Sequence, residues 1–111
     1  MPPTFAVLIP TLNVESVLEK SLVSIKGQNY PAGLIEIIVA DGGSTDKTLE
    51  IARKYGAKVY KNPLKTGEAG KAVALRHAQG EFVLLLDSDN ILPDKNWLRQ
   101  MVEPFSDPEI I

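Results

Sequence analysis

Cysteine is absent from the 111 residues of this chain, which excludes disulfide bonds, thiolate zinc sites and cysteine nucleophiles. Its absence fits a reducing compartment. Long hydrophobic runs are also missing, because the longest apolar segments fall far short of the ~20 residues that a transmembrane helix needs. The first residues lack the basic and apolar regions of a signal peptide. We therefore expect a cytoplasmic chain with no membrane segment of its own.

A strong excess of charge of one sign is missing as well. The formal net charge is −2, so the chain lacks the basic surface that nucleic-acid binding requires. The hydrophobic fraction of 44% and the charged fraction of 23% are ordinary for a soluble globular protein. The length suits one domain.

Apolar segments and amphipathic segments alternate along the chain. Apolar runs predict strands over Phe5–Ile9, Ile35–Ala40, Lys58–Tyr60 and Phe82–Leu86, the first of them stopped by Pro10. Helical spacing predicts helices from Val14 to Ile25, from the loop after Asp41 to Tyr55, from about Glu68 to Gln79, and onward from Pro93-Asp94. Asn13 is the expected cap of the first helix. This alternation predicts an α/β fold with right-handed crossovers and a parallel, Rossmann-like sheet.

The last residues, Glu109-Ile110-Ile111, resemble the first residues of a further strand. A parallel sheet cut at that point would have an unfinished edge. We therefore expect the chain to be one half of a larger domain, with an open edge through which copies could associate.

Polar residues follow three of the predicted strands and would meet at one rim of a parallel sheet. They form the segments Pro10-Thr11-Leu12-Asn13, Asp41 to Asp46, and Asp87-Ser88-Asp89-Asn90. Because strand side chains alternate, Asp87 and Asp89 would leave the last strand on the same face. Two carboxylates at a strand end suit a divalent cation and the phosphates it carries. Gly70-Lys71, at a helix start, could also face phosphate.

Each of these signals has a simpler interpretation when taken alone. Asp41 could be only a helix cap or an Asx turn, and Lys71 a solvated surface lysine. His77 is a lone histidine on a helix, which indicates a structural or surface role.

Taken together, the segments resemble glycosyltransferase family 2, a group of inverting enzymes with the GT-A fold. The resemblance rests on Val-Leu-Ile-Pro-Thr-Leu-Asn, Ala-Asp-Gly-Gly-Ser-Thr-Asp, Gly-Lys-Ala-Val-Ala-Leu and Leu-Leu-Leu-Asp-Ser-Asp, in this order, and extends from about Phe5 to Phe105. It implies a Rossmann-like three-layer sandwich with a mostly parallel sheet. Residues 1–111 would then be a partial GT-A domain, the nucleotide-diphospho-sugar-binding half.

The resemblance also implies roles for individual residues. Pro10, Thr11 and Leu12 would line the nucleotide base, and Asp41 would hydrogen-bond to it. Lys71 would approach the base or the diphosphate. In the Asp-x-Asp motif, Asp87 would meet the ribose and Asp89 would bind Mg²⁺ or Mn²⁺, with Ser88 between them and Asp87 as a second candidate metal ligand.

The sequence departs from the family pattern at several positions. Leu12 stands where an aromatic residue is common, Val14 where an acid is frequent, and Gly42 where a second acid usually follows Asp41. These departures leave the identity of the nucleotide base open. The family's general base and acceptor-binding region would lie beyond Ile111. The resemblance allows polysaccharide or lipid-linked acceptors, and a position at the cytoplasmic membrane face through sequence not present here.

Other interpretations of the same motifs fit less well. A dehalogenase-type phosphatase needs Thr or Val where Ile91 stands. A dinucleotide-binding fold needs a glycine-rich turn after the first strand, and a P-loop needs glycine where Lys65 stands and Ser or Thr where Ala72 stands. A non-catalytic nucleotide-sugar-binding or scaffold module remains the alternative to an enzyme.

Overall fold

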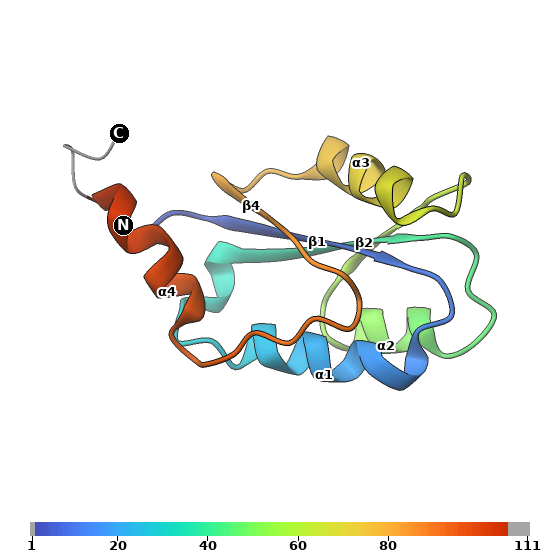
Figure 1. Cartoon of the computed structure of the whole chain (residues 1–111), viewed down its shortest axis with the longest axis horizontal. Helices are drawn as coiled ribbons and strands as arrows, with labels where there is room; N and C mark the ends of the chain where they lie inside the picture. The colour runs from blue at the N-terminus through green and yellow to red at the C-terminus, as the bar shows by residue number, and fades with distance from the viewer. Residues whose placement is uncertain (1, 107–111) are drawn as a thin grey trace.

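A parallel four-stranded sheet forms the centre of the molecule (Figure 1). The structure, a computed structural model, describes residues 2–106. Its strands are β1 (Phe5–Thr11), β2 (Ile35–Asp41), β3 (Lys58–Lys61) and β4 (Phe82–Leu85), in the order β3-β2-β1-β4. Every pairing between neighbours is parallel, which confirms the predicted sheet. The strand expected at Glu109–Ile111 lies outside the described residues.

Helices cover both faces of the sheet and produce the three expected layers (Figure 1). Helices α1 (Glu15–Lys26) and α2 (Thr48–Lys54) lie on one face, and α3 (Gly67–His77) lies on the other. The short helix α4 (Trp97–Val102) packs near the end of α1 and continues into a 3₁₀ turn over Glu103–Ser106; another 3₁₀ turn, Ala32–Leu34, precedes β2. The chain moves outward from β1 to β3 and then returns to β4. With crossovers of one hand, that reversal requires α3 to lie on the opposite face.

Strand β1 is buried on both sides, as its continuous apolar run predicts. Val7 and Ile9 face the cluster that includes Leu18 and Leu22 of α1. Ala6 and Leu8 face the cluster under α3, with Ala74. The carboxyl end of β1 is therefore held rigidly at the middle of the sheet.

Pro10 does not stop β1, contrary to the sequence prediction, because the strand continues to Thr11. The carbonyl of Leu8 accepts a hydrogen bond from the N–H of Leu86, so the backbone groups of even-numbered β1 residues point toward β4. Strand β4 ends at Leu85. Since no β4 partner remains beside Pro10, its missing N–H costs the sheet no hydrogen bond.

Helix α4 starts at Trp97, later than the Pro93-Asp94 signal predicts. The side-chain amide of Gln28 occupies the place of the first helical bond: its Nε2 donates to the carbonyl of Asp94 at 2.6 Å, and its Oε1 accepts from the N–H of Leu98 at 3.0 Å. Gln28 and Leu98 are both buried. A direct bond between Asp94 and Leu98 is therefore replaced by a side-chain bridge.

Two further features of the fold concern side chains noted in the sequence. His77 stacks on the ring of Tyr60, with centroids 3.6 Å apart and planes 5° from parallel, so it packs against β3 and has a structural contact. Along the outer strand β4, Val83 and Leu85 are exposed by 43% and 51%. Within residues 2–106, no helix is long and apolar enough to span a bilayer.

Candidate functional site

The strand order reverses between β1 and β4, and a pocket opens beside their carboxyl ends. Such switch points are where open α/β sheets bind ligands. The pocket has a volume of about 200 Å³ and is lined by Pro10, Thr11, Leu12, Asp87 and Ser88, together with Asn62, Lys65, Thr66 and Gly67 from the connection between β3 and α3. We call it the switch-point pocket. It brings together most of the residues that the sequence singled out.

Lys71 is placed at the same rim by the start of α3. Its Nζ lies 3.2 Å from Oδ1 of Asp87, and about a third of the Lys71 side chain is exposed. Gly70 allows α3 to come this close, because a Cβ atom there would lie 2.7 Å from Cβ of Pro10. Thr66 caps the helix by accepting a hydrogen bond from the N–H of Ala69. A cation and a carboxylate from segments far apart in sequence thus meet beside the pocket.

Asp87 and Asp89 lie in a turn and not in the strand. The side chain of Asn90 accepts the N–H of Asp87 at 2.9 Å, and the N–H of Asn90 returns to the carbonyl of Asp87. Because β4 ends at Leu85, the strand alternation used to place both aspartates on one face does not extend to them, and their shared face stays a prediction. Both carboxylates are nevertheless exposed, whereas Ser88 between them is half-buried.

Among the described residues, the two aspartates belong to no larger cluster of metal-binding side chains. Within the part of the chain that the structure describes, no cluster of three or more His, Cys, Asp or Glu side chains could hold a metal ion. Two carboxylates alone do not enclose a cation, but Mg²⁺ is often held by one or two carboxylates together with substrate phosphates. The Asp-x-Asp turn fits a cation of that kind.

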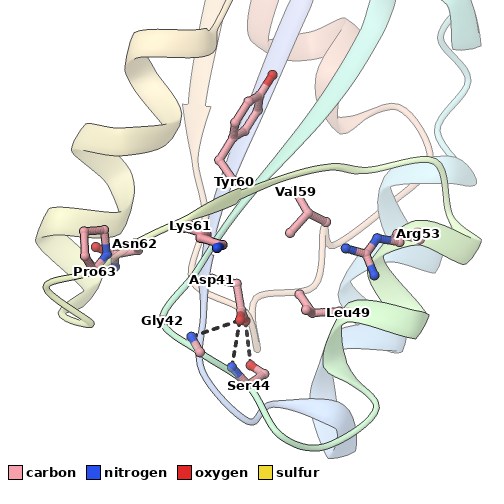
Figure 2. A pocket seen from close by; sticks show the side chains of 11 residues that line it. Asp41, Gly42, Ser44, Leu49, Arg53, Val59, Tyr60, Lys61, Asn62 and Pro63 are labelled. Carbon is pink, nitrogen blue, oxygen red and sulfur yellow. Dashed lines mark hydrogen bonds between the residues drawn. The ribbon is translucent and has the colours of Figure 1, made fainter.

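Asp41 is buried and lies outside the switch-point pocket. Its Oδ1 accepts the hydroxyl protons of Thr11, at 2.7 Å, and of Ser44. Its Oδ2 accepts the N–H groups of Gly43 and Ser44, and Figure 2 shows the carboxylate turned toward Ser44. Burial raises the pKa of Asp41, but these bonds lower it by more, so the pKa ends below its usual range. The carboxylate therefore organises its own loop, as in an Asx turn.

The loops after β1 and β2 are joined by hydrogen bonds that the sequence did not suggest. Asn13 has a positive φ of 50° and does not cap α1, contrary to the prediction. Its N–H donates to Oγ of Ser44, and its side-chain oxygen accepts the N–H of Thr45 at 2.8 Å. Asn13 thus stabilises the loop after β2 and does not cap α1, the helix that follows it.

The start of α1 is capped from that neighbouring loop. The N–H of Val14 donates to the hydroxyl of Thr48 at 2.9 Å, and the N–H of Glu15 donates to Oδ2 of Asp46 at 3.2 Å. The Thr48 side chain also donates to Asp46 and, as the largest cause, lowers the pKa of that carboxyl. Only the cap-forming Ser-Thr-Asp composition could have hinted at this role, and composition does not identify which helix is capped.

Comparison with known proteins points in the same direction as the geometry. A family model described as glycosyl transferase family 2 matches residues 6–111. The poly(ribitol-phosphate) β-N-acetylglucosaminyltransferase TarS of Staphylococcus aureus is 40% identical over 94 residues, which cover 79% of this chain and 16% of TarS.

Solved structures of glycosyltransferases share the fold. Crystal structures include S. aureus TarS 1-349 with UDP, at a TM-score of 0.83 and 34% identity over 93% of this chain and 32% of that one. The mannosyltransferase PcManGT of Pyrobaculum calidifontis, with GDP-Man and Mn²⁺, gives a TM-score of 0.84 and 30% identity over 97% of this chain and 34% of that one. This chain thus spans about a third or less of these proteins. The family match over nearly its whole length shows that the chain belongs to glycosyltransferase family 2.

Proposed function

We propose that this chain is the donor-binding part of an inverting glycosyltransferase, which transfers a sugar from a metal-bound nucleotide-diphosphate sugar to an acceptor. The observation that carries the proposal is the position of the Lys71–Asp87 ion pair at the rim of the switch-point pocket. A cation beside carboxylates suits a ligand that carries both diphosphate and a divalent metal. UDP, UDP-GlcNAc and GDP-Man in the solved relatives support this donor class.

The proposed residue roles follow the layout of the pocket. Pro10, Thr11 and Leu12 would line the base, Lys71 would approach the diphosphate, and Ser88 would contribute its backbone and hydroxyl. Asp87 would meet the ribose. Asp41 would contact the base only by exchanging one of its present hydrogen-bond partners, because each of its carboxylate oxygens already accepts two bonds.

We further propose that Asp89, with Asp87 as the second candidate, would hold Mg²⁺ or Mn²⁺. Bringing an anionic diphosphate beside a carboxylate at ~4 Å costs about 4 kcal/mol per close pair of charges at an effective dielectric near 20. When bound, the cation would neutralise the diphosphate and stabilise the departing nucleoside diphosphate. Mn²⁺ in the PcManGT complex supports a divalent metal.

The acceptor and its activation are proposed to involve sequence beyond Ile111. We expect a polysaccharide or lipid-linked acceptor, as the poly(ribitol-phosphate) in the name of TarS illustrates, and a general base outside these residues. The chain by itself should bind donor weakly and transfer no sugar. We place it in the cytoplasm, with any attachment to the cytoplasmic membrane face made by sequence not present here.

Calorimetric titration with UDP and GDP, each with and without Mn²⁺, tests the proposal. Asp89→Ala should weaken metal-dependent binding by at least about tenfold, the scale on which even an outer partner of a metal site matters. Glu50→Ala, which removes an exposed acid of α2, is the matched control and should change nothing. Absence of binding at millimolar nucleotide would reject the donor site.

One observation favours a second candidate, a scaffold that pairs through the open edge of the sheet. Exposed Val83 and Leu85 lie on β4, an outer strand in the described structure, and unpaired edges attract further strands. Sedimentation analysis of the chain and of Val83→Lys separates the two functions. Dimers that Val83→Lys abolishes, together with no nucleotide binding, would favour the scaffold.

A further inference from the structure

A second and larger pocket lies between α2 and the outer strand β3, away from the switch point. Its volume is about 370 Å³, and Leu49 and Arg53 of α2 lie opposite Val59 and Lys61 of β3 (Figure 2). We call it the α2–β3 pocket. Asn62 is the one residue that it shares with the switch-point pocket. Its volume falls in the range of sites for small molecules, which is roughly 300–1,000 Å³.

The inner part of this pocket is apolar. Leu49 is half-buried, but it lies outside both hydrophobic core clusters, although helical spacing places it on the buried side of α2. Val59 is also half-buried and closes the core at the edge of the sheet. Because the Leu49 side chain lines the pocket and does not pack in the core, it provides a surface for an apolar ligand group.

Two cations flank this apolar surface. Arg53 and Lys61 make no side-chain hydrogen bond or ion pair with another residue of the described part of the chain, whereas Lys54, next to Arg53, pairs with Glu19. Figure 2 shows the guanidinium of Arg53 turned toward Val59 and Leu49, with Lys61 on the other side of Val59. Both cations are thus available to a ligand that enters the pocket.

The one acid in the pocket wall offsets only one of these two positive charges and pairs with neither cation. Asp41 lines the pocket, but hydrogen bonds from Thr11, Gly43 and Ser44 already occupy both of its carboxylate oxygens. The chain as a whole carries a net charge of −2. A pocket with two unpaired cations on such a chain selects for an anion, and a guanidinium favours the planar or multidentate geometry of a carboxylate or phosphate.

We propose that the α2–β3 pocket binds a small organic anion with an apolar body and one carboxylate or phosphate group. The apolar body rests on Leu49 and Val59, and the acidic group meets Arg53 and Lys61. Neither part suffices alone, because the apolar surface cannot select an anion and the cations are exposed to solvent. This site differs from the proposed donor site in the two cations that it uses and in requiring no metal, although Asn62 lines both pockets and Asp41, which lines this one, is also a proposed donor-site residue.

Backbone amide NMR of the full chain tests the site with four probes: phenyl phosphate, benzoate, inorganic phosphate and benzyl alcohol. Phenyl phosphate or benzoate should shift the amides of Leu49, Arg53, Val59 and Lys61, and the stronger of the two identifies the acidic group. Inorganic phosphate carries the anionic group alone, and benzyl alcohol carries the apolar body alone. Each should bind at least about tenfold more weakly.

Matched variants complete the test. Arg53→Gln and Lys61→Gln should each weaken the aromatic anion by about tenfold. Lys20→Gln, at an exposed lysine of α1 outside both pockets, should have no effect. If inorganic phosphate binds as tightly as the aromatic anion, the site is only a patch of surface charge. If benzyl alcohol binds as tightly, the cations have no role. Amide shifts confined to the switch-point pocket would place the anion there. Each of these results overturns the proposal.

Discussion

Nζ of Lys71 and Oδ1 of Asp87 lie 3.2 Å apart, although the two residues come from opposite ends of the α3 crossover. The pair is partly exposed, so its own contribution to stability is small, about 0–1 kcal/mol. Its importance lies in the charge that it presents at the switch point. Lys71 compensates Asp87, one carboxylate of the Asp-x-Asp turn, whereas no cation within residues 2–106 pairs with Asp89.

Replacement of Lys71 by Gln should therefore have opposite effects on two ligands. Mn²⁺ alone should bind a few-fold more tightly, because a neighbouring positive charge is removed, and metal-free UDP should bind a few-fold more weakly. Isothermal titration of each ligand at low salt measures both constants, with Lys20→Gln as the control. A change of the same sign for both ligands would contradict the assigned charge roles.

Asp41 should matter more for stability than for binding. Asp41→Ala leaves four hydrogen-bond donors without the buried carboxylate that accepts them. We expect a loss of about 3 kcal/mol in the free energy of unfolding, measured in urea. Because folding lowers the pKa of Asp41, its contribution is present above the ordinary aspartate pKa and is lost as pH falls through the lowered value.

An acid titration of stability checks that sign. The wild-type chain should lose stability below about pH 4, and Asp41→Asn should lose less over the same interval because the titrating group is gone. An equal loss in both would assign the acid sensitivity to other groups. A change in preference between UDP and GDP on Asp41→Asn, at unchanged stability, would instead support a direct contact with the base.

Gly70 should resist even the smallest side chain. Ala at this position would place its Cβ 2.7 Å from Pro10, so α3 must shift away from β1, and overpacking of this kind costs about 1–3 kcal/mol. Gly67→Ala is the control, because a Cβ atom added there would meet nothing within 4 Å and Ala favours helix. Thermal unfolding of both variants should separate them, with Gly67→Ala unchanged or more stable.

The amide of Gln28 should hold α4 in place. Gln28→Ala removes both halves of the bridge between Asp94 and Leu98, and we expect a loss of about 1–2 kcal/mol and faster hydrogen exchange at the Leu98 amide. Gln100→Ala, at an exposed glutamine of α4, should leave that exchange unchanged. Unchanged exchange in Gln28→Ala would show that α4 closes its own first turn.

The architecture and the meeting of distant motifs could be predicted because they follow from chain order. Alternation of strands and helices implies a parallel sheet, and a parallel sheet collects the carboxyl ends of its strands at one rim. The meeting of Asp87 and Pro10 at the switch point can therefore be predicted without any knowledge of side-chain geometry. The family resemblance carried the same motifs to glycosyltransferases, and the match over residues 6–111 confirms it.

Details that depend on lateral contacts could not be predicted. Asn13 has the residue type of a local cap, but its positive φ sends its side chain to the adjacent loop, and the cap of α1 comes from Asp46 and Thr48. Helical periodicity assigns Leu49 to the core, although it lines a pocket. Periodicity reports which side of a helix faces inward and not whether that side meets packed atoms or open space.

The bridge made by Gln28 also determines where this chain can be divided. A boundary drawn after β4 would separate the glutamine from Asp94 and Leu98, leaving its Oε1 without the Leu98 donor and its Nε2 with the Ser24 carbonyl alone. Residues 92–102 should accordingly open together with α1 as one cooperative unit, so a chain shortened to end at Leu86 would lose more than a terminal helix.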